Sequence, residues 1–559
     1  MALRKFHGVL ELRPPPFRKL PRDIRRKFMA AIEALEAPRI GADEATRTRL
    51  VLVAASLGTV FEWYDFFLYG SLAVFFGALF FPPGNETAAF LASLATFGAG
   101  FAVRPFGALV FGGLGDRIGR KRCFMITMVM MGLSTVLVGL LPTYAQVGVW
   151  APVLLVSLRL TQGLAVGGEY GSAATYVAEH AGSGRRGYYT SWLQTTSTIG
   201  LLLSLLIILI CRVSLGDETF KAWGWRIPFL TSIFLLAVSI YIRLKLEESP
   251  VFQKMKLAGR ISKSPVREAF GSWANMKNVL VLLFGITSGM TVIWYGAQFY
   301  ALFFMQNTLH VDYKTSYAII AIGLALGTPL IVLCGALSDR IGRRPVMIAG
   351  MLLGAFTFIP SFHALANFAN PGLAAFAARN PIQISADDCT FSLFAAPVSA
   401  CDKARKFFSR NGLSFTSIPA AKGGEVVTRI GGTTLTGFDE PAYEKALDAA
   451  GFKGSAGDVN VAGSIGVMVW LLALVGMVYG PMAAFMVEMF PAKIRTTSLS
   501  LPYHLGVGVL GGFLPFVASA LVIYAGNIYA GLWYPVGIAL ATAVIALMVL
   551  PETKDRAID

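Results

Sequence analysis

The chain has 559 residues, of which 55% are hydrophobic and only 14% are charged, and its mean hydropathy is +0.62. Soluble domains carry about 25% charged residues, so this composition excludes an ordinary water-soluble globular protein. The net charge of +16 would suit a nucleic-acid ligand, but the distribution of the charge indicates membrane topology instead.

Twelve apolar stretches are long enough to cross a bilayer as helices. A β-barrel is disfavoured, because its strands would alternate polar and apolar residues in segments of about 10. We therefore predict an all-α polytopic membrane protein with twelve transmembrane helices. The predicted spans are 51–80, 88–113, 123–141, 151–177, 188–211, 226–242, 279–304, 316–337, 346–363, 463–487, 498–524 and 531–550.

Lysine and arginine gather in alternate loops. The predicted inner loops and the two termini hold 33 of the 48 Lys and Arg, whereas the short outer loops hold Arg212, Lys221 and Lys314. The positive-inside rule then places both termini in the cytoplasm, and we expect a multi-pass protein of the plasma (cell inner) membrane. Residues 1–50 contain no apolar core, so we expect a basic cytoplasmic tail without a cleavable signal peptide. Within this tail, 24–35 is either a short helix on the inner leaflet or a disordered segment.

A repeated octapeptide marks a duplication. Residues 115–122 return almost unchanged as 338–345, and each copy lies between two apolar spans. Duplicated bundles are a common build for secondary transporters, with the substrate site between the halves. The repeat therefore predicts two pseudo-symmetric six-helix bundles.

Each copy of the repeat is expected to form a cytoplasmic gating loop. In this prediction Asp116 and Asp339 open a tight turn that Gly119 and Gly342 close, and an arginine ties the Asp to a neighbouring span. The alternative is that the basic residues only anchor the loops at the headgroups. The predicted gating residues are Gly112, Asp116, Arg117, Gly119, Arg120, Gly335, Asp339, Arg340, Gly342 and Arg343.

Two further features divide the chain. A charged linker at 243–278 separates an N-terminal bundle, 51–242, from a C-terminal bundle, 279–550, which a cytoplasmic tail at 551–559 follows. A second repeated pattern, around Glu179 and Glu488, is 309 residues apart, whereas the octapeptides are 223 apart. The excess predicts an insertion between spans 9 and 10.

The predicted insert, 364–462, faces outward and contains no spanning segment and no strong hydrophobic period. It is either a small domain that caps the outer mouth or a tolerated loop with no transport role. Its two cysteines, Cys389 and Cys401, are a possible disulfide, because the periplasm is oxidising.

Charged residues deep in spans are costly and point to function. They gather in the N-terminal half, and the interiors of spans 7 to 12 contain no Asp, Glu, Lys or Arg. Glu62, Asp65 and Tyr69 fall at i, i+3 and i+7, so they share one face of a helix. Span 2 contributes Arg104.

Span 4 carries Arg159, Gln162 and Glu169 on one stripe. We expect Arg104 and Arg159 to pair with two of the three carboxylates. The third carboxylate, Asp65 first and Glu62 second, would be desolvated and could take up and release a proton near neutral pH. The alternative is a static charge network that only fixes helix packing.

The C-terminal half offers uncharged polar groups. Tyr295 and Gln298 in span 7 can donate hydrogen bonds to a ligand, or form ordinary bonds between helices. Tyr479-Gly480-Pro481 should break span 10, and Pro502 should loosen the start of span 11. Broken helices often line cavities.

These motifs resemble the major facilitator superfamily. The loop signature appears as Gly112-x3-Asp116-Arg117-x-Gly119-Arg120 and again as Gly335-x3-Asp339-Arg340-x-Gly342-Arg343, and the span-4 signature as Arg159-x2-Gln162-Gly163. The resemblance implies a proton-coupling role for Arg159. Phe61-Glu62-Trp63-Tyr64-Asp65, Gly167-Gly168-Glu169-Tyr170-Gly171 and Phe490-Pro491-x3-Arg495 resemble the metabolite:proton symporter group.

We therefore predict a secondary active transporter that imports a small polar metabolite, an organic acid first, together with protons by alternating access. Asp65, Glu62, Glu169 and Arg159 are the predicted proton-coupling residues. The predicted substrate-binding residues are Arg104, Arg159, Gln162, Tyr69, Tyr295 and Gln298. The alternatives are a symporter of a zwitterion or osmolyte, an uncoupled facilitator, and a transporter-like sensor.

The other expected partners follow from the same motifs. The energy source is the proton gradient, the surroundings are the lipid bilayer, and the protein is expected to act as a monomer. An enzyme is disfavoured, because the spans contain no metal-ligand cluster and no pairing of a nucleophile with a base. No cofactor, metal or nucleic-acid partner is expected.

Overall fold

The computed structural model describes residues 42–118, 120–181, 184–244, 264–387, 389–390, 397–420, 424–491 and 494–558. The chain divides into two compact units, Met1–Val51 and Leu52–Asp559, and the second unit holds nearly all of the described helices and strands. Most of the predicted N-terminal tail and the linker residues 245–263 lie outside the described residues.

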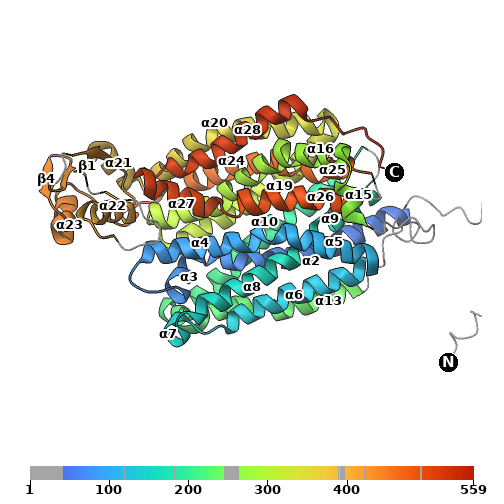
Figure 1. The fold of residues 1–559 in the computed structure, drawn as a ribbon, viewed down its shortest axis with the longest axis horizontal. Helices are drawn as coiled ribbons and strands as arrows, with labels where there is room; N and C mark the ends of the chain where they lie inside the picture. Colours follow the sequence, from blue (N-terminus) through green and yellow to red (C-terminus); the bar gives the residue numbers. More distant parts are fainter. Residues whose placement is uncertain are drawn as a thin grey trace, which may run out of the picture. The chain divides into compact units, whose positions relative to one another are not determined.

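The N-terminal half consists of helices, several of them in broken pairs (Figure 1). Its elements are α2 (Ala42–Ser71), α3 (Ala73–Phe80), α4 (Glu86–Ala102), α5 (Arg104–Ile118), α6 (Arg120–Leu140), α7 (Tyr144–Val147), α8 (Trp150–Val166), α9 (Tyr170–His180), α10 (Arg186–Leu215), α11 (Asp217–Thr219), η2 (Phe220–Gly224), α12 (Arg226–Leu230) and α13 (Ser232–Leu244).

The C-terminal half has the same helical build, with several π-helical turns. Before the insert it contains α15 (Pro265–Phe270), α16 (Trp273–Leu282), η3 (Leu283–Thr287), α17 (Ser288–Tyr295), η4 (Gly296–Tyr300), α18 (Ala301–Phe303), η5 (Phe304–Thr308), α19 (Tyr313–Ile341) and α20 (Arg343–Ala369). After it come α24 (Val461–Tyr479), α25 (Met482–Glu488), α26 (Arg495–Leu505), η6 (Gly506–Gly511), α27 (Leu514–Ala525), η7 (Ala530–Leu532) and α28 (Trp533–Val549).

Every predicted span has a helix at its place. Among the described residues, eight helices are long and apolar enough to cross a membrane, and two bent helix pairs bring the number to ten. Two shorter apolar helices, Met125–Leu140 and Trp150–Val166, occupy the positions of predicted spans 3 and 4. The protein is a polytopic helical membrane protein with twelve spans in two bundles.

Glycines allow the helices of the N-terminal half to meet backbone to backbone. A Cβ added at Gly163 on α8 would lie 1.8 Å from the Gly100 carbonyl oxygen, and one at Gly107 on α5 would lie 2.1 Å from the Leu164 carbonyl oxygen. Such close approach is typical of small residues between transmembrane helices. It fixes the two helices that carry Arg104 and Arg159 against each other.

The predicted break in span 10 is present, whereas the start of span 11 stays helical. α24 ends at Tyr479 and α25 begins at Met482, so Gly480 and Pro481 interrupt span 10. Pro502 lies inside α26, and the π-helix η6 follows directly. Irregular turns of this kind are frequent at functional sites.

The insert is folded, which the weak hydrophobic period did not predict. It contains α21 (Pro371–Arg379), β1 (Ile382–Ala386), α22 (Ala400–Arg410), β2 (Phe415–Pro419), β3 (Val427–Ile430), β4 (Thr433–Thr436) and α23 (Glu440–Ala449). The sheet has the order β2-β1-β3-β4, with β1 parallel to β2 and antiparallel to β3. Phe408, Tyr443 and Ile384 are buried in its core.

A disulfide also stabilises the insert. Cys389 and Cys401 are joined by a disulfide, and their Cα atoms are 5.1 Å apart. Figure 1 shows the insert at one end of the helices, beyond the ends of α4 and α27. We call this the insert end, and we call the opposite end, which holds Glu179, Asp339, Arg343, Glu488 and the C-terminal segment 551–558, the tail end.

The expected geometry of the repeated loop is wrong in one respect. Asp116 lies within α5 and Asp339 lies in the last turn of α19, so neither residue opens the turn. The second turn is made by Gly342 alone, whose φ of 106° is a conformation that favours glycine. This geometry leaves the Asp339 carboxylate free to bind another helix.

Candidate functional site

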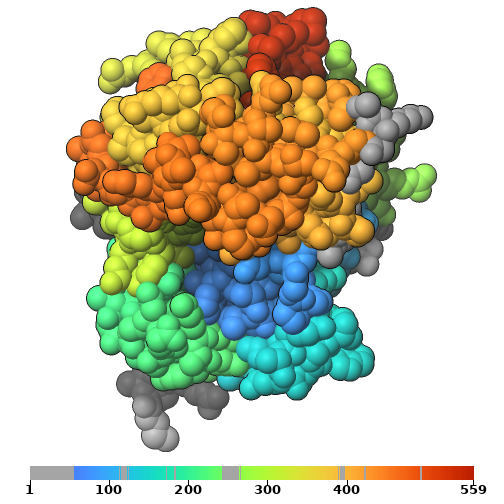
Figure 2. Space-filling view, turned by 90° about the vertical axis from the view of Figure 1, so that its left-hand side faces the viewer, coloured from blue at the N-terminus to red at the C-terminus, as the bar shows by residue number. Residues whose placement is uncertain are grey.

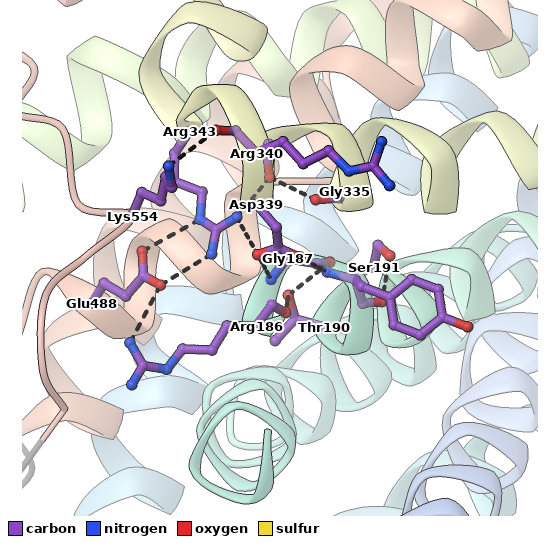
Figure 3. A network of polar contacts seen from close by, with 12 residues as sticks. Arg186, Gly187, Thr190, Ser191, Gly335, Asp339, Arg340, Arg343, Glu488 and Lys554 are labelled. Atoms are coloured by element: carbon purple, nitrogen blue, oxygen red, sulfur yellow. Dashed lines mark hydrogen bonds and ion pairs between the residues drawn. The ribbon is translucent and has the colours of Figure 1, made fainter. Parts of the chain in front are cut away.

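The tail end is closed by polar contacts between the two halves (Figure 3). Asp339, on α19, accepts hydrogen bonds from the backbone N–H groups of Gly187 (2.9 Å) and Tyr188 (2.7 Å). These groups belong to the first turn of α10, where the unpaired N–H groups and the helix dipole favour an anion. One half of the protein therefore caps a helix of the other half.

Arg343 holds this cap in place. Its Nη1 lies 2.6 Å from Asp339 Oδ1, and its Nη2 lies 3.3 Å from Glu488 Oε1. Arg186 of the N-terminal half approaches the same Glu488 oxygen at 3.7 Å. A second buried pair between the halves joins Arg495 Nη1 to Glu179 Oε1 at 2.9 Å.

Two glycines let the helices come close enough for these bonds. A Cβ added at Gly187 would lie 2.5 Å from the Gly335 carbonyl oxygen, and one at Gly335 would lie 2.6 Å from the Gly187 carbonyl oxygen. The absence of a side chain at Gly335, a predicted gating residue, thus permits the close approach of the two helices.

The C-terminal segment braces the same contacts. Glu552 accepts hydrogen bonds from the backbone N–H groups of Arg343 and Arg344, and Thr553 donates to Glu488. Burial raises the pKa of the Glu552 carboxyl, but the bonds from these backbone N–H groups outweigh it and hold the pKa below its usual range. This stabilisation is present above the ordinary carboxyl pKa and is lost as the pH falls through the lowered value.

The first copy of the loop is only partly described. Gly112 lies in α5, whereas Gly119 and the side chains of Asp116, Arg117 and Arg120 lie outside the described residues. Their gating role stays a prediction.

Arg104 lies at the centre of the molecule, where α5 begins. Its side chain is fully buried, and its Nε, Nη1 and Nη2 atoms have no hydrogen-bond partner among the described residues. The guanidinium instead stacks on the rings of Phe101 and Phe66, at 4.0 and 4.2 Å from the ring centroids. Cation–π contacts compensate only part of the cost of burying a charge.

Arg159 is buried close by, on α8. Its Nη1 donates to Gln162 Oε1 (2.5 Å), and Gln162 Nε2 donates to Thr135 Oγ1 (2.8 Å). Its Nε and Nη2 atoms have no partner in the part of the chain that the structure describes. The guanidinium lies over the rings of Phe66 and Tyr69, at 4.3 and 4.6 Å.

The expected ion pairs of these arginines are therefore wrong. No carboxylate of the described residues forms a hydrogen bond with Arg104 or Arg159. Glu169 accepts a hydrogen bond from Thr127, and Glu62 and Glu169 line a small cavity of about 20 Å³. Sequence reasoning missed the aromatic rings that take the place of carboxylates around both guanidinium groups.

Asp65 lies on the same helix as Glu62 and is nine-tenths or more buried. Its Oδ1 atom has no hydrogen-bond partner among the described residues. Tyr69, one turn further along, donates to the Ser93 carbonyl oxygen (3.1 Å), so its hydroxyl is already engaged.

The C-terminal half faces this layer with further unpaired groups. Both side-chain polar atoms of Gln298, Thr291 Oγ1 and Trp294 Nε1 are buried without a partner within the described ranges, and the buried His504 ring faces the backbone of Gly167. Tyr295 packs edge-on against Phe101 at 5.2 Å, which places it beside Arg104. Gln298 and Tyr295 were predicted as site residues from their span. The structure adds Thr291, Trp294 and His504. These three could have been found in the sequence as polar side chains within apolar spans.

We call these residues the central layer: Arg104, Arg159, Gln298, His504, Thr291, Trp294 and Tyr295. The cavity at this level, bounded by Trp63, Phe67, Trp294 and Tyr503, is only about 10 Å³, which is close to the space of one water molecule. On the insert side of the layer, Phe67 and Phe97 of the N-terminal half pack on Phe299 of the other half, at 5.2 and 5.1 Å. Beyond these rings lies a cavity of about 610 Å³ at the insert end.

No group of three or more His, Cys, Asp or Glu side chains within the described ranges is placed to hold a metal ion. What the central layer offers is a set of buried donors, two of them cationic, between two halves that are sealed together at the tail end. This geometry fits a membrane carrier in which two bundles enclose a central layer of buried polar groups.

Comparison with known proteins gives the family. Residues 50–263 match the family described as "Sugar (and other) transporter". The alpha-ketoglutarate permease of Escherichia coli (strain K12) is 36% identical over 329 residues, which cover 58% of this chain and 74% of that protein. A proline/betaine transporter of Salmonella typhimurium is 37% identical over 329 residues, which cover 56% of this chain and 64% of that protein.

The fold agrees with a solved structure. The xylose transporter XylE from E. coli, in a partially occluded inward-open conformation, superposes with a TM-score of 0.60 at 16% identity over 91% of this chain and 99% of that one. The chain belongs to the major facilitator superfamily of membrane transporters.

Proposed function

We propose that the protein imports a small organic acid together with protons across the inner membrane by alternating access. The observation that carries this proposal is the pair of buried arginines, Arg104 and Arg159, whose free N–H donors have no acceptor among the described residues. A buried unpaired charge is costly, and a substrate carboxylate would supply the missing acceptor with paired hydrogen bonds. The likeness to an alpha-ketoglutarate permease supports the same class of substrate.

Proton coupling follows from the acids of α2. Asp65 is buried and forms no hydrogen bond with Arg104 or Arg159, so neither arginine pairs with its carboxyl group. In this proposal Asp65 carries the proton, with Glu62 as the second candidate, and Glu169 and Arg159 link its charge to substrate binding. Gln162 orients Arg159 through their hydrogen bond.

The positive-inside charge count supports an orientation with the tail end and both termini in the cytoplasm. The insert end and its disulfide would then face an oxidising periplasm. We propose that a monomer is the working unit, because the two halves of one chain supply both sides of the central layer.

A zwitterion is the second candidate substrate. The rings of Phe66, Phe101 and Trp63 surround the Arg104 guanidinium, and rings in such an arrangement also bind quaternary ammonium groups. The likeness to a proline/betaine transporter supports this candidate.

A thermal-shift screen on the purified protein separates the two candidates. We expect carboxylates such as alpha-ketoglutarate to raise the melting temperature, and glycine betaine to leave it unchanged, because RT ln(1 + [L]/Kd) is added to stability. The shift should become much smaller in Arg104→Gln, while the melting temperature of this variant without ligand stays at or above that of the wild type, since an unpaired buried charge is removed. Stabilisation by betaine alone would replace the organic acid with the zwitterion.

A further inference from the structure

A cavity of about 610 Å³ lies at the insert end. It lies between α3 and α4 of the N-terminal half and η4, η5 and α27 of the C-terminal half, and α22 of the insert closes one side. Small-molecule sites typically enclose about 300–1,000 Å³. The central layer, with about 10 Å³, cannot hold an organic acid in this conformation, whereas this outer vestibule can.

One side chain in its wall has an unused hydrogen-bond donor. Gln306, Asn307 and His310 all line the vestibule, and Asn307 Nδ2 has no partner among the described residues. The Gln306 side chain is hydrogen-bonded to Tyr317, and the His310 ring is hydrogen-bonded to the backbone of Arg410 and Asn411. A buried polar group without a partner costs roughly 1–3 kcal/mol, so Asn307 keeps a donor for an acceptor that the described residues do not supply.

The backbone at this place is strained. His310 has a φ of 52°, and it is the only non-glycine residue with a positive φ in the described part of the chain. Such a conformation costs on the order of 1–3 kcal/mol for a residue other than glycine and is typical of ligand sites. Gly412, which follows α22, packs on the Thr308 carbonyl oxygen, so the insert helps to hold this turn.

The insert adds positive charge to the vestibule. Arg410, at the end of α22, lines the cavity, and its only acidic neighbour in the described wall is Glu86, with 3.8 Å between Nε and Oε2. The two side chains are 63% and 83% exposed, so their interaction contributes only about 0–1 kcal/mol and leaves Arg410 able to bind an anion. Lys406, one turn earlier, donates to Asn85 Oδ1 (3.1 Å) and brings a second cation to the same rim.

The insert therefore touches both halves of the carrier. Besides the Lys406–Asn85 bond to the N-terminal half, Arg405 donates to the Tyr524 carbonyl oxygen (2.7 Å) of the C-terminal half. Figure 2, which looks onto the insert end, shows the insert in orange directly against the blue segment of the N-terminal half. A ligand that enters between the halves passes the cations of α22.

We propose that the outer vestibule is a second binding site, for small carboxylates, at which Arg410 and Asn307 bind the ligand before it reaches the central layer. The class follows from the wall: Asn307 offers an unused donor, Arg410 stays exposed despite its contact with Glu86, and the rings of Phe81, Phe90 and Phe303 accept a small apolar body. A ligand carboxylate can take the place of Glu86 as the acceptor of the Arg410 guanidinium. This inference rests on the proposed organic-acid function and adds a site that the insert completes.

Uptake kinetics test the vestibule. In proteoliposomes with an imposed pH gradient, the KM for alpha-ketoglutarate should rise about tenfold in Arg410→Gln and in Asn307→Leu, because each loses about one charge-assisted or buried hydrogen bond, while the maximal rate stays within twofold. Lys403→Gln is the matched control, since it removes the same charge from an exposed position of the same helix and should leave KM unchanged. Equal KM values in all four proteins would overturn the proposal.

Binding without transport separates this proposal from the proposed function. In Arg104→Gln, which disables the central layer, alpha-ketoglutarate should still bind weakly by isothermal titration, and adding Arg410→Gln should remove that binding. Complete loss of binding in Arg104→Gln alone would contradict the vestibule site and leave the central site intact. Carboxylate binding that survives Arg104→Gln at full affinity, but fails in Arg410→Gln, would instead overturn the central site and retain the vestibule.

Discussion

The tail end and the central layer are both buried charged regions between the same two halves, yet their bonding differs. At the tail end, Asp339 meets two backbone N–H groups and Arg343, and Glu488 meets Arg343, Arg186 and Thr553. In the central layer, Arg104 meets only aromatic rings among the described residues. The protein satisfies the first region by itself, whereas the second keeps unpaired donors among the described residues.

This difference assigns separate tasks to the two regions. Buried charges that are fully paired stabilise one arrangement of the halves. Removing one partner leaves the other charge buried and unpaired, which costs free energy. Unpaired donors in a closed layer raise the free energy of the empty carrier and are relieved when an anion binds. In the proposed mechanism, the tail end therefore sets which conformation is populated, and the central layer sets what is carried.

The largest expected effect concerns the proton site of the central region. In Asp65→Asn, uphill uptake in vesicles with a pH gradient should fall at least about 100-fold, because an amide cannot carry the proton, and this exceeds the change that a lost neutral hydrogen bond would cause. Substrate exchange at equal pH should persist, since it needs no net proton movement. Glu218→Gln, which removes an exposed carboxylate, should transport normally. Uphill uptake that survives in Asp65→Asn would mean that another residue carries the proton. Wild-type uptake that ionophores leave unchanged would favour an uncoupled facilitator.

Opening of the tail end should follow removal of its cap. Asp339→Ala removes two helix-capping bonds between the halves and should shift the equilibrium by about 2 kcal/mol, or roughly 30-fold, toward a form open at the tail end. A cysteine at Ser197, which lines the small central cavity, in a variant with Cys123, Cys211 and Cys334 changed to serine, reports this opening by maleimide labelling in inside-out vesicles.

A matched control lies on the same helix. Asp312 caps the first turn of α19 through Lys314 N and Thr315 N, but both partners belong to its own half. Asp312→Ala should cost similar local stability without faster labelling. If both alanine variants label at the same rate, capping between the halves does not control the tail end.

A smaller effect is expected just inside the sealed region. Tyr170 of the N-terminal half stacks on Tyr503 of the other half with 3.8 Å between ring centroids, and Tyr170 donates to Gln194. Replacing each tyrosine and then both by leucine should give a coupling energy of about 1 kcal/mol in the same labelling assay, a change of about fivefold. If the effects of the two single substitutions simply add in the double variant, the ring stack does not stabilise the closed form.

The smallest effect on transport is expected from the disulfide of the insert. Cys389→Ser should lower the stability of the insert by about 3 kcal/mol, seen as faster hydrogen exchange in α22. The maximal uptake rate should stay within twofold, because the seal and the central layer do not contact the bridge. Cys211→Ser, which changes a free cysteine, should leave hydrogen exchange of α22 unchanged. A collapsed maximal rate in Cys389→Ser would show that the insert takes part in the conformational cycle itself.

The helical fold could be predicted from sequence because each apolar span carries its own signal. Span length and the break at Gly480 depend on neighbours along the chain, and both appear in the structure. At Pro502 the helix α26 continues, and the irregular turn begins only at Gly506. The central arginines were recognisable for the same reason, since a charge within an apolar stretch is visible without a partner.

The partners of those residues could not be predicted. Arg104 stacks on Phe101 and Phe66, and phenylalanine in a span carries no sequence signal that distinguishes a cation–π contact from ordinary packing. Asp339 caps a helix through Gly187, which lies 152 residues earlier in the chain, and only the packing of the halves reveals this contact. The insert was recognised by its length. Its buried and exposed residues alternate over helices and strands that are too short to give a clear hydrophobic period.

The place where the insert leaves the bundle has an evolutionary consequence. The backbone N–H of Asn460 donates to the Phe368 carbonyl oxygen (2.8 Å), so the chain departs after α20 and returns before α24 at almost the same point. A segment attached through such neighbouring ends can be gained or lost as a cassette without rethreading the helices. Joining the two ends with a short linker would give a trimmed carrier, and the disulfide-closed insert itself offers a rigid landmark for aligning single-particle images.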